Sequence, residues 1–206
     1  MLDVLDRKIR QMHLALGDLE KSDLSQLKST VVEDKGGFYR ELDFNQGQSD
    51  AQLANTASLL ISNIASLKDH LKAWCKKHGT NFEGDKLIDG NLDVATIHDL
   101  WNIDKHAELN RAPRSGRIPR LENLRQDLKL STGTSANSSA LFMMDPRTGK
   151  MISQTTGSAK ITLSINADVI DENGDRIGDF AKMCEDATGA WEETLLAAGV
   201  PIPPRG

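Results

Sequence analysis

The chain has 206 residues, and its 30 acidic and 25 basic side chains give a formal net charge of −5. Its length suits one domain of ordinary size, and its 38% hydrophobic and 27% charged residues exclude a wholly disordered or fibrous chain. The acidic balance excludes a general electrostatic attraction to nucleic acid or to anionic membranes, so any phosphate contact has to be local.

Cysteine content and the amino terminus indicate the compartment. The 2 cysteines, Cys75 and Cys184, are too few and too far apart for a disulfide framework, and no cysteine or histidine cluster has zinc-ligand spacing. The amino terminus has no apolar run behind a basic start, and no stretch of about 18 uncharged apolar residues occurs. We therefore expect a cytoplasmic protein with no membrane span, no metal and no cofactor.

The first segment predicts an amphipathic helix, because its apolar residues recur at steps of three and four. They are Leu2, Leu5, Ile9, Met12, Leu16 and Leu19. The pattern continues less regularly to Val31 and then meets Gly36 and Gly37, which signal a helix stop. A short linker is expected over 38–45.

Two further helices follow in the predicted order. The strongest pattern of the chain comprises Leu53, Ala57, Leu60, Ile64, Leu67, Leu71, Trp74 and His78, which predicts one long core helix of a bundle. Gly79 would end it. A third helix is expected from Asp93 to Asn110, with Pro113 beyond its end.

The composition and period then change. Arg111, Arg114, Arg117, Arg120 and Arg125 fall in one stretch, so 111–138 is expected to be a basic and polar connector. Apolar and polar residues alternate over 139–145, 151–155 and 161–170, which predicts strands joined by hairpin turns. A closing helix is expected over 178–198, followed by a tail over 199–206.

The expected fold is α+β and mainly α. It is a single domain over 1–206, in which a four-helix bundle carries a small antiparallel β-sheet inserted between the third and fourth helices. Three helices would occupy 1–110, and the β-hairpin insertion would occupy 139–177.

Polar residues share one face of the third helix, because they recur every four residues. They are His98, Asn102, His106 and Asn110. The plain interpretation is a solvated face, or hydrogen bonds inside the bundle. Alternatively, His70 on the second helix would pair with Asp69 or Asp104 and face His106 across the bundle.

Residues 101–106, Trp-Asn-Ile-Asp-Lys-His, resemble a motif of the HEPN superfamily (higher eukaryote and prokaryote nucleotide-binding). Members of this superfamily are helical bundles, often dimeric, and the nuclease branch carries an arginine, a polar residue, three variable residues and a histidine. Asn102 and His106 match the last two positions, whereas Trp101 stands where the arginine would be. The resemblance spans roughly 52–196 and extends to uncharacterised bacterial proteins through Asp69-His70-Leu71, Asp104-Lys105-His106 and Ala190-Trp191-Glu192.

This resemblance implies an RNA-targeting effector that works as a homodimer and, if it is an enzyme, a metal-independent endoribonuclease. His106 would act as general acid or base on the 2′-hydroxyl, beside Asn102. A cation must stabilise the charge that develops on the phosphate, which a tryptophan cannot do. We expect Arg111, near the end of the same helix, to be the substitute.

The candidate binding residues are Arg114, Arg117 and Arg120 of the connector, with His98 and His70. These arginines would contact phosphates, or belong to a merely solvated linker. No aromatic residue interleaves with them, so stacking on single-stranded bases is not indicated. The alternative function is a non-catalytic protein-interaction or ligand-binding helical module, in which His106 is structural and a protein partner replaces RNA.

Overall fold

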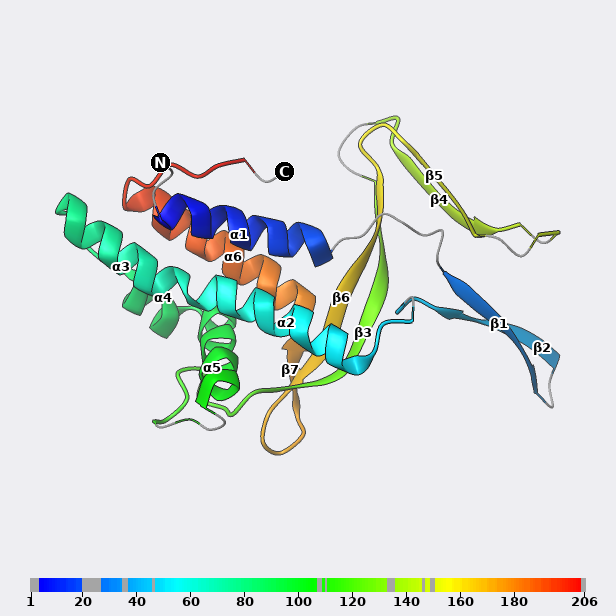
Figure 1. Cartoon of the computed structure of the whole chain (residues 1–206), viewed down its shortest axis with the longest axis horizontal. Coiled ribbons are helices and arrows are strands. Elements are labelled where there is room, and N and C mark those ends of the chain that lie inside the picture. Colours follow the sequence, from blue (N-terminus) through cyan, green and yellow to red (C-terminus); the bar gives the residue numbers. More distant parts are fainter. Residues whose placement is uncertain are drawn as a thin grey trace. The chain divides into compact units, whose positions relative to one another are not determined.

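A computed structural model describes residues 4–19, 27–34, 37–45, 47–106, 109, 111–132, 136–145, 147–148 and 151–204. Its contacts divide the chain into two compact units (Figure 1). Unit 1 comprises 1–18, 54–124 and 166–206, and unit 2 comprises 19–53 and 125–165. The expectation of a single domain stays a prediction, because compactness does not show whether either unit folds alone.

Six helices occur in the described residues: α1 (Val4–Leu19), α2 (Asp50–Ala65), α3 (Leu67–His78), α4 (Gly84–Gly90), α5 (Leu92–His106) and α6 (Phe180–Ala197). In unit 1, α1 and α6 are joined by His13 and Glu192, whose Nε2 and Oε1 atoms lie 2.7 Å apart. The fully buried side chains of Trp191 and Phe180 on α6 belong to the core. Burial of large apolar side chains is the main stabilising contribution here.

The long helix expected over 53–78 is two helices, which meet at Ser66. The Ser66 hydroxyl donates to the carbonyl of Asn63 at 3.4 Å, a local bond that competes with helix continuation. Because Ser66 keeps right-handed backbone angles, the apolar stripe still runs through both helices. Its predicted members Leu60, Ile64 and Leu67 are buried.

The longest strands are β3 (Arg120–Ser131) and β6 (Lys160–Ile170), which form a three-stranded sheet with β7 (Arg176–Asp179) in the order β3-β6-β7. The β6–β7 pair is antiparallel, with Asp168 opposite Asp179. Both long strands continue from one unit into the other: 120–124 and 166–170 belong to unit 1, and 125–131 and 160–165 to unit 2.

Unit 2 also holds two antiparallel hairpins. One consists of β1 (Lys28–Asp34) and β2 (Gly37–Asp43), and the other of β4 (Ser139–Met144) and β5 (Met151–Thr156). Buried Ile161 and Leu163 of β6 form its small core, against which partly buried Leu27, Phe44, Leu128, Ala140 and Phe142 pack.

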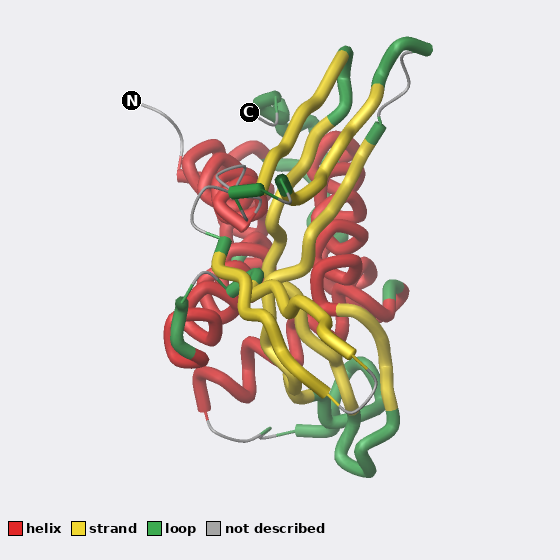
Figure 2. Tube along the Cα trace, turned by 90° about the vertical axis from the view of Figure 1, so that its right-hand side faces the viewer, coloured by secondary structure: helices red, strands yellow, loops and turns green. Residues whose placement is uncertain are grey.

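The predicted four-helix bundle with a small inserted sheet is wrong, because strands extend through much of the molecule (Figure 2). The hairpin β1–β2 replaces the helical continuation to Val31 and the linker expected over 38–45. The sequence has a run of β-branched residues, Thr30 to Val32, followed by the pair Gly36-Gly37, which favours a hairpin over a helix.

Strand β3 lies inside the range that was expected to be an irregular connector. Its alternation of leucine with charged residues changes phase at Asn123, which adopts φ 54°, a left-handed conformation that asparagine tolerates. Half-buried Leu121 precedes this residue, and half-buried Leu124 and Leu128 follow it one position out of phase. Because of this phase change, the strand's two-residue period cannot be recognised in the sequence.

Other expected elements are confirmed. The strands expected over 139–145, 151–155 and 161–170 are present as β4, β5 and β6, and the closing helix is α6. The third expected helix is α5, described as far as His106, and 107, 108 and 110 of its expected range lie outside the described residues. Helix α4 and strand β7 were not predicted. Within the described ranges, no helix combines the length and apolar character needed to cross a membrane.

Candidate functional site

Helix α5 of unit 1 carries the candidate polar face, and its two halves lie in different surroundings. Asn91 begins the helix, because its Oδ1 accepts a hydrogen bond from the backbone N–H of Val94 at 3.1 Å. The residues from Val94 to Leu100 are buried, whereas those from Asp104 to His106 are exposed. His98 therefore lies inside unit 1 and His106 at its surface.

His98 is a buried, neutral histidine. Its Nδ1 accepts a hydrogen bond from the amide of Asn102 at 3.0 Å, and the Trp101 ring lies edge-on at a centroid distance of 5.7 Å. Burial, together with the positive charges of Lys68 and Arg114, lowers the pKa of His98 to about 4. A general base works best with a pKa near the operating pH, so His98 is poorly suited to catalysis.

Asp99, beside His98, holds the loop that follows α5. It is 1% exposed, and its Oδ2 accepts hydrogen bonds from the backbone N–H and the hydroxyl of Ser115, each at 2.8 Å. Hydrogen bonds to a charged acceptor are stronger than neutral ones. The carboxylate therefore fixes the loop 111–118 against the helix.

Arg114 on this loop forms ion pairs with two aspartates of α4. Its guanidinium lies 3.0 Å from Asp89 and 3.2 Å from Asp85, and Lys68 lies 2.8 Å from Asp85. The Lys68 ammonium, with a smaller contribution from Arg114, holds the pKa of Asp85 below its ordinary value. Arg114 is therefore part of an ion-pair network between the loop, α3 and α4.

Arg117 lines a pocket of about 390 Å³ in unit 1. Leu92 and Thr96 of α5, Ser115 and Arg117 of the loop, and Arg176 and Ile177 of β7 surround it. The Arg117 side chain is 52% exposed and lies 3.7 Å from Asp171. That buried aspartate uses its other oxygen to accept the backbone N–H groups of Asn173 and Asp175.

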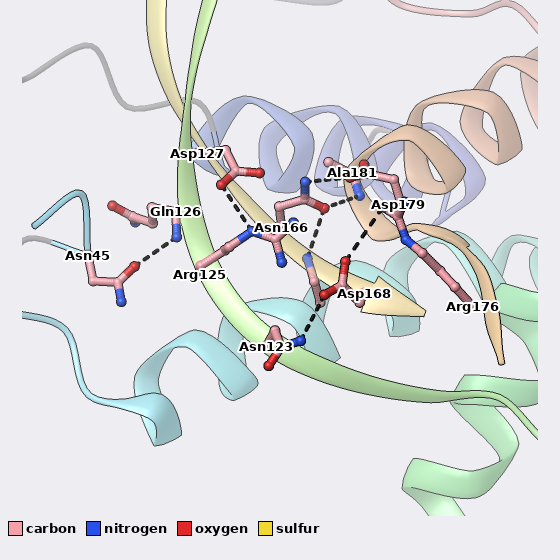
Figure 3. A network of polar contacts seen from close by, with 11 residues as sticks. Asn45, Asn123, Arg125, Gln126, Asp127, Asn166, Asp168, Arg176, Asp179 and Ala181 are labelled. Carbon is pink, nitrogen blue, oxygen red and sulfur yellow. Dashed lines mark hydrogen bonds and ion pairs between the residues drawn. The ribbon is translucent and has the colours of Figure 1, made fainter. Parts of the chain in front are cut away.

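Arg176 reaches the same pocket from the sheet. It is 61% exposed and lies 3.5 Å from Oδ1 of Asp168, whose Oδ2 accepts a hydrogen bond from Asn123 at 2.8 Å (Figure 3). Sequence reasoning missed Arg176 because 58 residues separate it from Arg117 in the chain, as their residue numbers show. Only the fold brings the two arginines to one pocket.

The remaining candidates do not converge on one site. His106 and Arg111 are both exposed, and no hydrogen bond or ion pair joins them in the part of the chain that the structure describes. Burial is the main cause that lowers the pKa of His70, and the positive charge of Lys8 on α1 is the second cause. No hydrogen bond joins His70 to His106 among the described residues. Arg120 pairs with Glu122 at 3.0 Å, and Asn110 lies outside the described residues.

A histidine that the sequence analysis passed over lies between α1 and α6. His13 is buried, contacts Glu192 through Nε2, and leaves its Nδ1 buried without a hydrogen-bond partner. Its place one residue after Met12 in the apolar stripe is the sequence signal that was available. Within the part of the chain that the structure describes, no group of three or more histidine, cysteine, aspartate or glutamate side chains is arranged to hold a metal ion.

Comparisons with family models, curated proteins and solved structures find nothing that matches this chain. The argument about function therefore rests on the geometry of the residues themselves, and the HEPN resemblance stays a prediction.

Proposed function

We propose that the chain is a non-catalytic binding module whose pocket in unit 1 takes a small organic anion. The observation that carries the proposal is that Arg117 and Arg176 line one pocket while the side chains of both remain more than half exposed. A guanidinium group presents several N–H donors in a plane that matches a carboxylate or a phosphate.

The rest of the pocket lining defines the ligand further. The hydroxyl of Thr96 donates to the carbonyl of Leu92 at 2.8 Å, and that of Ser115 donates to Asp99. These protons are therefore used within the protein, which leaves the guanidinium groups as the side-chain donors of the lining. Leu92 and Ile177 supply apolar wall, so the ligand combines one anionic group with an apolar part.

The surroundings of α5 support a role without catalysis. His98 is buried and neutral, and Asn102 is hydrogen-bonded to it. Asp99 and Arg114 hold the pocket loop in place. The proposal includes a cytoplasmic location, which the two free, buried cysteines Cys75 and Cys184 support.

A metal-independent endoribonuclease, working as a homodimer on RNA, is the second candidate. The observation that favours it is the exposure of both His106 and Arg111 around the end of α5. This candidate predicts cleavage of a mixed RNA pool in the presence of a chelator, with cyclic phosphate ends, and loss of cleavage in His106→Ala. The binding-module proposal predicts no cleavage by either protein.

Calorimetric titration with phenyl phosphate and benzoate tests the binding proposal, with phenol as the neutral control. We expect binding of an anion and no binding of phenol. Arg117→Ala and Arg176→Ala should each weaken binding at least about tenfold. The matched control is Arg120→Ala, because Arg120 is as exposed as Arg117 but lies outside the pocket lining. Equal binding by all variants, or no binding of either anion, would overturn the proposal.

A further inference from the structure

Within the described residues, the ribbon formed by β4 and β5 in unit 2 has no further strand paired along either long edge. These strands form a two-stranded sheet, and neither is hydrogen-bonded to a third strand of the described chain. The backbone N–H and C=O groups along such an edge are a template for another strand.

Strands β4 and β5 carry none of the residues that commonly protect an edge strand. Proteins block open edges with charged side chains or proline. The sequences of β4, Ser-Ala-Leu-Phe-Met-Met, and β5, Met-Ile-Ser-Gln-Thr-Thr, contain neither. By contrast, β1 and β2 carry several charged residues, including Glu33, Asp34 and Arg40. The edge of the β4–β5 ribbon therefore differs from that of the other hairpin in the same unit.

One face of the ribbon is apolar and exposed. Leu141, Met143 and Ile152 are 46%, 45% and 43% exposed, and Met143 lies directly opposite Ile152 in the pairing. On the other face, Phe142 packs against the small core of Ile161 and Leu163. Exposed apolar side chains that adjoin one another mark interaction surfaces more often than isolated ones do.

We propose that a second copy of this chain covers this surface, with the β4 strands of the two copies paired antiparallel about a two-fold axis at Phe142. In this register Leu141 of each copy lies opposite Met143 of the other, and both remain on the exposed apolar face, because strand side chains alternate with a period of two. The two ribbons then form one four-stranded sheet. The contact is isologous, as in most homodimers.

The choice of β4 over β5 follows from the side chains that would face one another. The equivalent pairing of β5 about Ser153 places apolar Ile152 opposite polar Gln154. Pairing of β4 brings apolar side chains together, and no like charges meet within the strand. The proposal rests on unit 2 alone and is independent of the anion pocket in unit 1.

Sedimentation velocity of the full chain, over a roughly hundredfold range of concentration, tests this proposal. We expect a concentration-dependent dimer. Leu141→Lys places a charged side chain opposite the apolar Met143 of the other copy, on both sides of the two-fold axis. It should weaken the dimer at least about tenfold. The control is Leu59→Lys on α2 in unit 1, an exposed leucine that is not part of the ribbon; it should leave the dimer intact. Circular dichroism checks that each variant folds.

A double variant tests the register itself. Leu141→Lys combined with Met143→Glu puts opposite charges across the two-fold axis, because each residue 141 faces residue 143 of the other copy. This combination should restore much of the dimer that Leu141→Lys loses. A monomer at every concentration, loss of the dimer in Leu59→Lys, or no rescue by the double variant would overturn the proposed pairing.

Discussion

Helix α5 in unit 1 buries polar side chains, whereas the β4–β5 ribbon in unit 2 exposes apolar ones. The helix buries His98 and Asp99, whose hydrogen-bond partners are Asn102 on the helix and Ser115 on the loop that follows it. The ribbon leaves three large apolar side chains and an uncharged edge open to solvent. Buried polar groups with partners stabilise and position a structure, whereas open apolar and backbone groups are available to a partner. The comparison supports the proposal that binding uses exposed groups rather than the buried His98.

The largest effect on stability should come from Asp99→Ala. The substitution leaves the backbone N–H of Ser115 without its charged acceptor, so the free energy of unfolding should fall by about 3 kcal/mol. Asp104→Ala, at an exposed position on the same helix, should change it by less than about 0.5 kcal/mol. Urea unfolding measures both. Equal effects would show that the Asp99 network does not stabilise the loop.

The next effect is a pH dependence caused by His98. Its pKa is about 4 in the folded chain and 6.5 in the unfolded chain, so the unfolded state binds the proton first as the pH falls. The free energy of unfolding should therefore decrease between pH 6.5 and pH 4 by about 2 kcal/mol. His98→Asn should remove this part of the pH dependence, and His106→Asn should keep it. A pH profile of unfolding that His98→Asn leaves unchanged would contradict the burial of a neutral histidine.

Arg114→Ala should have a smaller effect. Arg114 is largely buried, but its partners Asp85 and Asp89 are exposed, so we expect a loss of about 1 kcal/mol. The loss should shrink at high salt, because solvent ions screen exposed partners. Arg120→Ala, whose pair with Glu122 is exposed on both sides, should cost about half as much or less. A larger loss of stability in Arg120→Ala than in Arg114→Ala would show that the Arg114 network does not stabilise the loop.

The smallest effect should be that of Met143→Ala on the ribbon. Measured where the chain is monomeric, it should change the free energy of unfolding by less than about 0.5 kcal/mol, because the side chain is exposed. Phe142→Ala, on the packed face of the same strand, should cost about 1 to 2 kcal/mol. A larger cost for Met143 than for Phe142 would show that the two faces of the ribbon have been interchanged.

Some elements could be predicted because their apolar periods are regular and local. The pattern Phe180, Cys184, Ala187 and Trp191 predicts α6, and the alternation within 161–170 predicts β6. Hairpin β1–β2 was missed because the spacing of Leu24, Leu27 and Val31 also fits a helix. Strand β3 was missed because Asn123 shifts its alternation by one residue. Tertiary context decided both cases.

The candidate site could be predicted only in part. Sequence spacing brought His98 and Asn102 onto one helix face, and the structure joins them by a hydrogen bond. It could not show that His98 is buried and His106 exposed, because burial depends on what packs against each half of α5. Nor could it bring Arg176 to Arg117, since a hairpin and a loop from distant parts of the chain form that pocket.

Titration of the full chain with phenyl phosphate, in parallel with Arg117→Ala and Arg120→Ala, tests the central claim most directly. The account predicts that the chain and Arg120→Ala bind with the same affinity and that Arg117→Ala binds at least about tenfold more weakly. Binding that depends equally on the two arginines, or on neither, would contradict the assignment of the pocket as an anion site.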